Sequence, residues 1–489
     1  MNSNGGGGAG GQGGHLVYDE LIPPGAAWAL ESGDAHGLVR AGCLETLSKY
    51  GYDGELEPML ATEWSQIDPT TWEFVLRDDV QFQNGTPMDA EAVAGALNHL
   101  LEAEVPALAF NPDVIATIEA TDESTVQITT PKADPLVPLR VASPNAGIMA
   151  PEAYEGKEID ILGTCTGPFE VTEEVPRQSL HLEANDDYWG GDVQLDSAEM
   201  RFVIDGATRA TQVQTGEAHI ARGIPAANLA TLRDDSNVEL LELSVARTTV
   251  LLLNNSRPPF DDPLVRQALQ HAVDSQAIVD SIYEGTGEPA VGPFAPDSPW
   301  APEGAEPPAY DVDEARSLLD QAGVDPSDLS IELLAYNDRP EFGDVAAVIQ
   351  DQLGELGIDV KIRGGEYTAL EPDLLGGNFD AALLSRGYLV DVAEPAGYLL
   401  SDYTCEGGYN LAKYCDPEVD RILEDVLSIE DAEARNEVYA QIAEKLQSDA
   451  ANLFLLHEGA AWGTQAAVEG FEPHPLEYYV LTADLALGG

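Results

Sequence analysis

The feature that most constrains this chain is a strand-to-helix transition near the middle of its 489 residues. Residues 250–253 form a short apolar run between polar neighbours, which is typical of a buried strand. The proline pair at 258–259 then interrupts any hydrogen-bonded ladder, because proline has no donor N–H. Asp261 or Asp262 can cap the amphipathic helix that follows. We therefore expect the chain to leave one lobe here and to enter a second.

Downstream of this transition, apolar runs of strand length alternate with helical patterns. The predicted strands lie at residues 331–336, 358–362 and 379–384, and the predicted helices at 313–322, 345–356, 369–375 and 435–447. Such alternation predicts a parallel sheet covered by helices. A strand at 453–456 leads back, and the chain recrosses near residues 459–462. Two crossings form a hinge, and a hinge between lobes creates a cleft.

The first half of the chain mixes hairpin and helix signals. A helix is expected at 37–50, where leucines fall on one side. Alternating apolar residues at 72–76 predict a half-buried strand, and Asp89 can cap the helix after it. Strands at 114–130 belong to a smaller accessory lobe, and residues 202–221 are typical of a β-α-β unit.

Charge narrows the choice of partners. The chain has 87 acidic and 23 basic residues, so its formal net charge is -64. This charge argues against nucleic acid or an anionic membrane as a partner. It would cause strong self-repulsion in dilute buffer, whereas in molar salt the screening length falls to about 3 Å. The acidic residues are spread evenly along the chain rather than gathered in a tail. We therefore predict an organism or compartment of high salinity.

The start of the chain is low in complexity. Residues 1–14 are mostly glycine, which is typical of a flexible tether. No signal peptide is visible, and no run of 18 apolar residues predicts a membrane-spanning helix. We interpret the sequence as a trimmed form of a longer precursor rather than as a cytoplasmic protein.

Catalytic signatures are missing from the sequence. It contains no GxSxG, no HExxH and no GxxxxGK[ST] motif, and none of its four cysteines forms a CxxC pair. Carboxylate pairs are frequent, but in so acidic a chain they are weak evidence for acid–base chemistry. We therefore predict that the protein is not an enzyme and holds no metal through its own residues.

Four segments together point to one family. They read LRDDVQFQNGTPMDAEAV at 76–93, GTCTGPFEV at 163–171, ANDDYWGG at 184–191 and TGEAHI at 215–220. With the central transition, they resemble the extracellular solute-binding proteins of family 5, which are the receptors of peptide and nickel ABC importers. In the last motif His219 replaces the aspartate of the family pattern. A lone histidine in a strand is usually a core residue.

The resemblance implies an α/β, bilobal, periplasmic-binding-protein-like fold with two hinge crossings and an accessory α+β lobe. The expected ranges are 1–15 for the tether, 16–52, 161–247 and 463–489 for lobe I, 53–160 for the accessory lobe, and 248–462 for lobe II. It further implies a monomeric receptor that captures short peptides between its lobes, without a cofactor, for an ABC permease and ATPase complex. Such receptors are held at the extracellular face of the cell membrane by a lipid anchor on the precursor. A secreted hydrolase is a less favoured alternative.

The resemblance also assigns residues to the ligand. The segment SRGYLVDVAEPAGYLL at 385–400 follows a predicted strand, at the edge where open α/β sheets bind ligands. Peptide-binding members have Trp, two further residues and then Asp, and here Tyr388 and Asp391 take those positions. In the family that aspartate pairs with the α-amino group of the peptide. A buried ammonium needs such a carboxylate, because its desolvation is otherwise uncompensated.

Five further residues complete the expected site. Leu389, Val390 and the nearby backbone would pair with the peptide as an added strand, which is insensitive to side-chain identity. Arg386 is the candidate for the peptide carboxylate, although relatives have their arginine one position earlier. In the first lobe, Gly33 and Asp34 lie where relatives offer backbone groups to the ligand.

Two disulfides are conceivable among the four cysteines. Cys405 and Cys415 flank a glycine-rich loop, and closing it would stabilise the fold by roughly 3 kcal/mol. Dipeptide-binding members of the family have a similar pair, so we expect a disulfide there. Whether Cys43 pairs with Cys165 stays open, and four buried thiols are the alternative.

A nickel or other metal chelate is the alternative cargo. The segment at 76–93 is especially similar to the nickel-binding branch. However, residues 102–112 contain neither the arginine nor the tryptophan of that branch, and Leu389 and Ala393 replace its aromatic pair. The site therefore favours a peptide.

Asn84 and Asn254 stand in N-x-[ST] sequons, which are acceptors for N-glycosylation. The sequence does not decide whether either asparagine is modified.

Overall fold

The computed structural model describes residues 13–389 and 392–488. They form two compact units: unit 1 comprises residues 13–132, 137–241 and 461–488, and unit 2 comprises 133–136 and 242–460. Two long strands pass from one unit into the other, β12 (Val238–Leu253) and β17 (Leu453–Gln465). The passage within β12 precedes residue 242, so the strand-to-helix transition lies inside unit 2. The finer division into lobe I and an accessory lobe stays a prediction.

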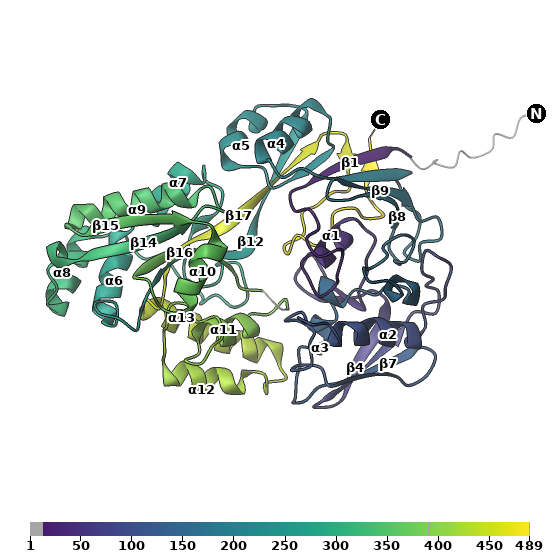
Figure 1. Ribbon diagram of the computed structural model, residues 1–489, viewed down its shortest axis with the longest axis horizontal. Helices are drawn as coiled ribbons and strands as arrows, with labels where there is room; N and C mark the ends of the chain where they lie inside the picture. The colour runs from purple at the N-terminus through teal and green to yellow at the C-terminus, as the bar shows by residue number, and fades with distance from the viewer. Residues whose placement is uncertain (1–12, 390–391, 489) are drawn as a thin grey trace, which may run out of the picture. The chain divides into compact units, whose positions relative to one another are not determined.

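Unit 2 is built on a sheet of order β15–β14–β16–β12–β17, with helices beside it (Figure 1). Strand β14 pairs in parallel with both β15 and β16, while β12 runs antiparallel to β16. The alternating pattern therefore predicted the parallel strands correctly. The remaining strands are β13 (Glu288–Pro289), β14 (Ser330–Tyr336), β15 (Asp359–Gly365) and β16 (Ala381–Gly387). The helices are α6 (Pro263–Ala272), α7 (Ser275–Ile282), α8 (Val312–Ala322), α9 (Phe342–Leu356), α10 (Tyr367–Leu375), α11 (Ala396–Tyr403), α12 (Pro417–Val426) and α13 (Ala432–Ser448).

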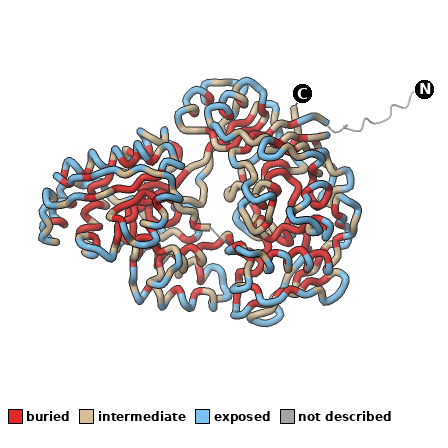
Figure 2. The backbone as a smooth tube through the Cα atoms, in the orientation of Figure 1, coloured by how far each residue is buried: buried red, intermediate tan, exposed pale blue. Residues whose placement is uncertain are grey.

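Local signals in the sequence set the ends of these helices. Asp262, rather than Asp261, caps α6, and its side chain accepts a hydrogen bond from the backbone N–H of Leu264. Helix α8 stops at Gly323, whose φ of 70° is left-handed and therefore suits glycine. Helix α9 packs on β14 and β15. Of these two strands, β14 is largely buried, whereas β15, at the end of the strand order, is partly exposed (Figure 2).

Unit 1 contains a sheet of order β17–β11–β1–β10–β9–β8. Strand β1 runs parallel to β10 and β11, and helix α4 connects these two, which confirms the predicted β-α-β unit. Val213, Ile224 and Leu229 form a core where α4 and α5 cover the sheet. The elements are β1 (His15–Glu20), β8 (Phe169–Val175), β9 (Ser179–Ala184), β10 (Ser197–Phe202), β11 (Ile220–Arg222), α4 (Gly206–Thr215) and α5 (Ala226–Arg233).

A second, antiparallel sheet of unit 1 has the order β4–β5–β7–β6 and packs against α2. Asp89 caps α2 as predicted, accepting from the N–H of Ala92. The elements here are β4 (Ala61–Asp68), β5 (Thr71–Leu76), β6 (Thr117–Ala120), β7 (Thr125–Thr129) and α2 (Ala90–Leu101). Smaller elements are α3 (Val137–Arg140), the hairpin of β2 (Ser48–Tyr50) and β3 (Leu56–Pro58), and the pair β18 (Val468–Glu469) and β19 (Ala486–Leu487).

The helix predicted at 37–50 is confirmed only as far as Arg40, and the rest of the prediction is wrong. Helix α1 (Asp34–Arg40) is shorter, and β2 already begins at Ser48. The helix stops at Gly42, whose φ is 67° and whose added Cβ would lie 2.2 Å from the carbonyl oxygen of Leu481. The later leucines of the expected helix are buried in an irregular segment. Their spacing in the sequence resembles that of the apolar face of a helix, which explains the prediction.

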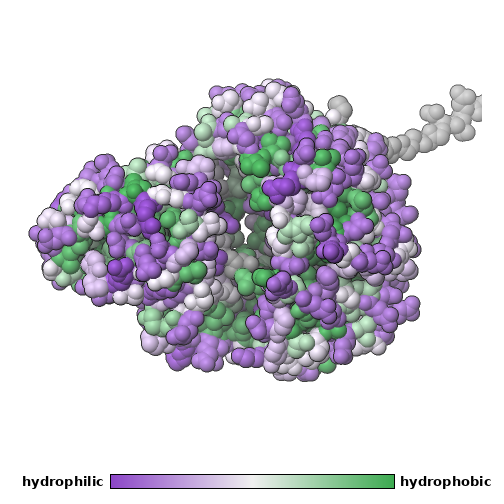
Figure 3. All heavy atoms as spheres, viewed as in Figure 1, coloured by the Kyte–Doolittle hydropathy of each residue, from purple (hydrophilic) through white to green (hydrophobic). Residues whose placement is uncertain are grey.

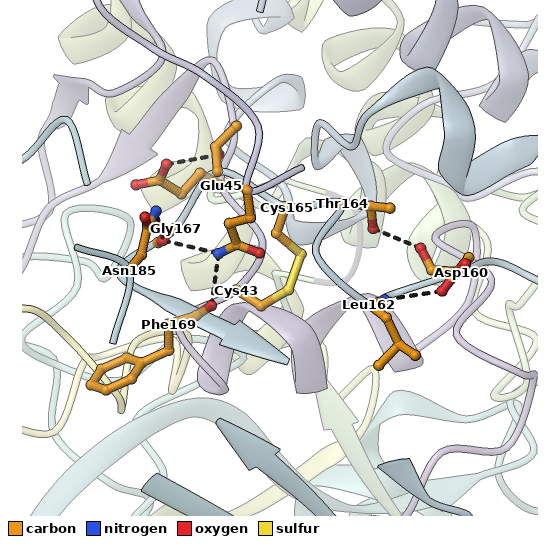
Figure 4. Close-up of a disulfide and its surroundings, with 11 residues drawn as sticks. Cys43, Glu45, Asp160, Leu162, Thr164, Cys165, Gly167, Phe169 and Asn185 are labelled. Carbon is orange, nitrogen blue, oxygen red and sulfur yellow. Dashed lines mark hydrogen bonds between the residues drawn. A yellow bond between two sulfur atoms is a disulfide. The ribbon is translucent and has the colours of Figure 1, made fainter. Parts of the chain in front are cut away.

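All four cysteines are paired. Cys405 bonds to Cys415 in unit 2, as expected, and Cys43 bonds to Cys165 in unit 1, which settles the open pairing. Figure 4 shows the unit 1 bridge, beside which Asn185 donates to the carbonyl oxygen of Gly167 at 3.0 Å. The bridge therefore lies in a hydrogen-bonded part of the core.

The surface agrees with the composition. Figure 3 shows hydrophilic residues over much of the visible face of both units. Among the residues that the structure describes, no helix combines the length and the apolar character needed to cross a membrane.

Candidate functional site

The carboxyl edge of the unit 2 sheet gathers polar side chains. Strands β14 and β16 end there in parallel, at Tyr336 and Gly387, and Arg247 on the antiparallel β12 pairs with Gly387. Open α/β sheets bind ligands outside the carboxyl ends of their strands. This edge is therefore the first place to look for a site in unit 2.

Glu458, on β17, organises this edge. Its Oε1 accepts from the Thr249 hydroxyl at 2.7 Å and from the Ser385 hydroxyl at 2.5 Å. Its Oε2 accepts from Nη1 of Arg339 at 2.9 Å. The carboxylate is thus held by two hydroxyls and one cation, so its position is fixed before any ligand arrives.

Arg339 is the more exposed partner of this pair. Its side chain is 27% exposed, whereas that of Glu458 is 8% exposed. Burial alone would lower the pKa of Arg339, but the carboxylate of Glu458 outweighs it and holds that pKa above its ordinary value. Within the described part of the chain, the hydrogen bonds of Arg339 leave through Nη1. The Nε and Nη2 donors of this permanent cation remain available to an anionic group.

Aromatic residues support the edge from behind. The Tyr336 hydroxyl accepts from the backbone N–H of Ser385 at 3.2 Å. The ring of Tyr367, at the start of α10, meets Tyr336 edge-on at 5.2 Å, and its hydroxyl contacts that of Tyr409. Tyr409 lies in the loop that the Cys405–Cys415 disulfide closes, so this loop contributes to the support of the edge.

Arg386, the predicted partner of a peptide carboxylate, is engaged inside unit 2. Its Nε and Nη2 donate to the two carboxylate oxygens of Asp402 at 2.7 and 2.8 Å. Its guanidinium also lies 4.5 Å from the ring centroid of Tyr409. A ligand carboxylate would have to compete with a bidentate partner that is already in place.

Tyr388 is a core residue in this structure. Its side chain is 3% exposed and packs edge-on against Phe294 at 5.4 Å and Trp300 at 6.2 Å. Leu389 is half-buried. Val390 and Asp391 lie outside the described residues.

The first-lobe candidates belong to unit 1 and organise a loop. Gly33 precedes α1, and Asp34 is its first residue. The Asp34 carboxylate accepts from the backbone N–H groups of Gly25, Ala26 and Trp28 at 2.8, 2.7 and 3.1 Å. These bonds shape the loop after β1, and a contact with a ligand stays a prediction.

Unit 1 has its own charged cluster at the carboxyl ends of β1 and β11. Glu20 accepts from the Tyr18 hydroxyl at 2.5 Å and from Arg222 at 2.8 Å, with Arg40 at 3.8 Å. Arg222 also donates to both carboxylate oxygens of Glu477, at 2.9 and 3.0 Å. Burial alone would raise the pKa of Glu20, but the two arginines outweigh it and lower that pKa to about 2. Here the charges satisfy one another inside the fold.

With this geometry in place, comparison with known proteins identifies the family. Residues 55–410 match the bacterial extracellular solute-binding proteins, family 5. The chain belongs to family 5. The predicted family and fold class are confirmed, and the family is one of solute-binding receptors, in agreement with the function expected from the sequence.

Relatives of this family 5 protein differ in what their names say they bind. A probable D,D-dipeptide-binding periplasmic protein of Escherichia coli is 28% identical over 88% of this chain and 86% of its own length. The nickel-binding periplasmic protein of the same species is 28% identical over 84% of this chain and 82% of its own. The solved structure of a nickel ABC transporter from Bacillus halodurans has a TM-score of 0.84 at 28% identity, covering 96% and 99% of the two chains. The likeness spans whole chains and leaves the cargo open.

Sequence analysis of this family 5 protein missed the pair of Arg339 and Glu458. Arg339 lies three residues beyond the end of a predicted strand at Tyr336, so the rule that ligands lie at strand carboxyl ends could have marked it. Glu458 gave no comparable signal, because its role depends on Ser385 and Thr249, which are distant in sequence.

Proposed function

We propose that this receptor captures short peptides and delivers them to an ABC permease and ATPase complex, working as a monomer. The observation that carries this proposal is the Arg339–Glu458 pair at the carboxyl edge of unit 2. It offers a partly exposed, pre-oriented cation. Asp391, expected from the family resemblance to meet an ammonium, would supply the opposite charge. A zwitterionic ligand with its charges at opposite ends suits such a pair of groups.

The charged ends of a peptide lose their water when they bind, and the site has to compensate for this desolvation. A peptide terminus that leaves water loses hydration, and a prepositioned opposite charge with matching hydrogen bonds offsets that loss. In this proposal Asp391 binds the amino end, and Arg339 binds the carboxylate through its spare donors. Arg386 then has a supporting role, because Asp402 already occupies its guanidinium. Leu389 and its neighbours supply backbone pairing that does not depend on peptide sequence.

Calorimetry with end-blocked peptides tests these assignments. In high salt, a short peptide, its N-acetylated form and its C-amidated form are titrated into the native protein and into Asp391→Asn, Arg339→Gln and Arg386→Gln. Each blocked end should weaken binding to the native protein by about 2 kcal/mol or more, which is roughly 30-fold. The acetylation penalty should vanish in Asp391→Asn, and the amidation penalty in Arg339→Gln.

Arg386→Gln is the matched control. It removes an arginine from the same unit and should keep the amidation penalty. Loss of that penalty in Arg386→Gln, together with its persistence in Arg339→Gln, would return the carboxylate to Arg386. A native protein that binds all three peptides equally, or none, would refute peptide capture through charged ends.

A metal chelate is the second candidate, favoured by the nickel-binding relatives. Among the described residues, no group of three or more His, Cys, Asp or Glu is placed to hold a metal ion. A chelate could still bind through its organic ligand. Elemental analysis and mass spectrometry of material released from the protein, purified from the cell that makes it, distinguish the two cargoes. Stoichiometric nickel without peptide would support the chelate.

We further propose that the receptor works at the extracellular face of the membrane in high salt, tethered through a lipid anchor on its precursor. The net charge of -64 and the glycine-rich first 14 residues support this setting. Because molar salt screens self-repulsion, the melting temperature should rise steeply between about 0.1 and 2 M KCl. A melting temperature that does not change with salt would contradict a halophilic origin, and a membrane fraction free of the protein would contradict the anchor.

A further inference from the structure

The two N-x-[ST] sequons occupy opposite environments. One comprises Asn84, Gly85 and Thr86, and the other begins at Asn254 and ends at Ser256. N-glycosylation needs an asparagine amide nitrogen that an enzyme can reach and that the fold does not already use. The structure therefore separates two motifs that are equivalent in sequence.

Asn254 is closed to modification. It is fully buried, and its Nδ2 donates to the carbonyl oxygens of Gly377 and Phe379, both at 3.0 Å. Its Oδ1 accepts from the Ser256 hydroxyl at 2.8 Å. Both amide hydrogens are engaged in the core, so a sugar on this nitrogen would break two buried bonds and find no space.

Asn84 is open. It is exposed in the turn between β5 and α2, where the N–H of Phe82 donates to the Thr86 carbonyl at 2.9 Å. Its Oδ1 accepts from the backbone N–H of Thr86 at 2.9 Å, which fixes the side chain as an Asx turn. Gly85, between them, has a φ of 83°. This arrangement holds Asn84 and Thr86 against each other at the surface.

The amide nitrogen of Asn84 keeps one hydrogen that no described residue uses. It makes one bond, 3.2 Å long, to a carboxylate oxygen of the exposed Glu152, so one amide hydrogen remains. Beside the turn, Thr86, His99 and Tyr154 line a hollow of about 600 Å³ on one side of α2. A first sugar attached at Asn84 can lie against this surface without displacing buried groups.

We propose that Asn84 is an N-glycosylation site and that Asn254 is not. The co-reactant is a lipid-linked oligosaccharide phosphate, which a membrane-bound oligosaccharyltransferase presents outside the cytoplasm. The Asn84 amide nitrogen gives up a proton to solvent and forms a bond to the anomeric carbon of the sugar. The bond between that carbon and the phosphate oxygen breaks, and the lipid phosphate leaves with the electron pair. The extracellular placement of the family brings the chain and this co-reactant to the same side of the membrane.

Peptide mapping by mass spectrometry tests the proposal on protein purified from the cell that makes it. We expect a glycan mass on the peptide that contains Asn84 and the unmodified mass on the peptide that contains Asn254. Asn84→Gln and Thr86→Val should abolish the glycan, whereas Thr86→Ser should keep it because the hydroxyl remains. Asn84 is exposed and Thr86 is half-buried, so the three variants should melt close to the temperature of the unglycosylated native chain.

Two results would overturn the assignment. One is an Asn84 peptide at its unmodified mass in protein from the producing cell. The other is a glycan on Asn254, which would mean that modification precedes folding and that burial does not select the site. Retention of the glycan in Thr86→Val would show that the attachment does not depend on the sequon.

Discussion

Each unit contains an ion pair of one glutamate and one arginine, and the two pairs differ in how far the arginine is exposed to solvent. At the carboxyl edge of unit 1, Glu20 and Arg222 are both buried, and Glu477 and Arg40 complete a closed network. At the corresponding edge of unit 2, a buried carboxylate, Glu458, holds an arginine that is partly exposed. A network whose charged groups all pair with one another holds strands and the C-terminal segment together; we call it closed. A pair whose cation is partly exposed, which we call half-open, can also bind a ligand. The difference teaches that exposure of the cation, rather than the presence of an ion pair, marks the candidate binding residue.

Desolvation explains why the two arrangements should behave differently on mutation. Removing one partner of a fully buried pair leaves an uncompensated charge, which costs about 3–5 kcal/mol. Removing a cation that water already reaches costs much less, because solvent can take over part of its role. The losses of stability caused by matched substitutions in the two units therefore measure how far each ion pair is shielded from solvent.

The largest expected effect follows from Arg222→Met. It should lower the free energy of unfolding of unit 1 by about 3–5 kcal/mol, since Glu20 and Glu477 lose their shared partner. Arg339→Met, the matched change in unit 2, should cost at most about half as much, because Glu458 keeps the Thr249 and Ser385 hydroxyls. Denaturant unfolding at fixed high salt measures both.

The same two variants should separate again in ligand binding. Arg339→Met should lose affinity for a peptide with a free carboxylate. Arg222→Met should bind the same peptide with native affinity under conditions in which the variant is folded. Equal losses of stability in the two variants, or a normal affinity in Arg339→Met, would remove the distinction between a closed and a half-open cluster.

A second prediction contrasts the two disulfides. Cys43 and Cys165 are fully buried, whereas Cys415 is exposed. Exposed bridges are the more easily reduced, because a thiolate must reach a sulfur atom. Mild reductant without denaturant should therefore open Cys405–Cys415 first, and lower the stability of unit 2 by up to about 3 kcal/mol through loss of loop closure.

Alkylation followed by mass spectrometry gives the order of reduction, and calorimetry gives the stability of the product. Because Tyr409 lies in the released loop and contacts Tyr367, peptide affinity should also fall when this bridge is open. Reduction of both bridges at the same rate would show that unit 1 opens as readily as unit 2, and would contradict the expectation that burial protects the unit 1 bridge.

Local features were predictable from the sequence, and distant pairings were not. The cap at Asp89 was predicted, and the cap of α6 was narrowed to Asp261 or Asp262, because caps act within one helical turn. The helix predicted at 37–50 ran too far because the leucine pattern was followed past Gly42, although Gly42 has the left-handed φ typical of a helix end. The packing of Gly42 against Leu481, far along the chain, could not be inferred from a local pattern.

The candidate site shows the same limit. Arg339 and Glu458 are 119 residues apart, and Arg222 and Glu477 are 255 apart. The motif at 385–400 begins within β16 and therefore starts at the carboxyl end of that strand. It did not show that Asp402 already pairs with Arg386, because that bond depends on how α11 packs.

The smallest expected effect sharpens the role of the cations in unit 1. Glu45 is also fully buried there, but it accepts from neutral donors, namely Thr166 at 2.8 Å, Tyr188 at 2.9 Å and Trp189 at 2.8 Å. Burial raises the pKa of Glu45 above its ordinary 4.5, whereas the arginines lower the pKa of Glu20 to about 2. The two buried glutamates should therefore oppose each other in the dependence of stability on pH.

The sign follows from linkage. Glu20 contributes stability above pH 4.5 that is lost as the pH falls through about 2, while the contribution of Glu45 is complete below pH 4.5 and declines as the pH rises through its raised pKa. Glu45→Gln should therefore gain stability relative to the native protein as the pH rises from about 4 to 7, and Glu20→Gln should lose it as the pH rises from about 2 to 4.5. Denaturant unfolding from about pH 2 to 7 at constant salt measures both slopes. Parallel curves for the native protein and Glu45→Gln would mean that Glu45 titrates normally, and that a buried carboxylate in unit 1 needs no arginine to stay ionised.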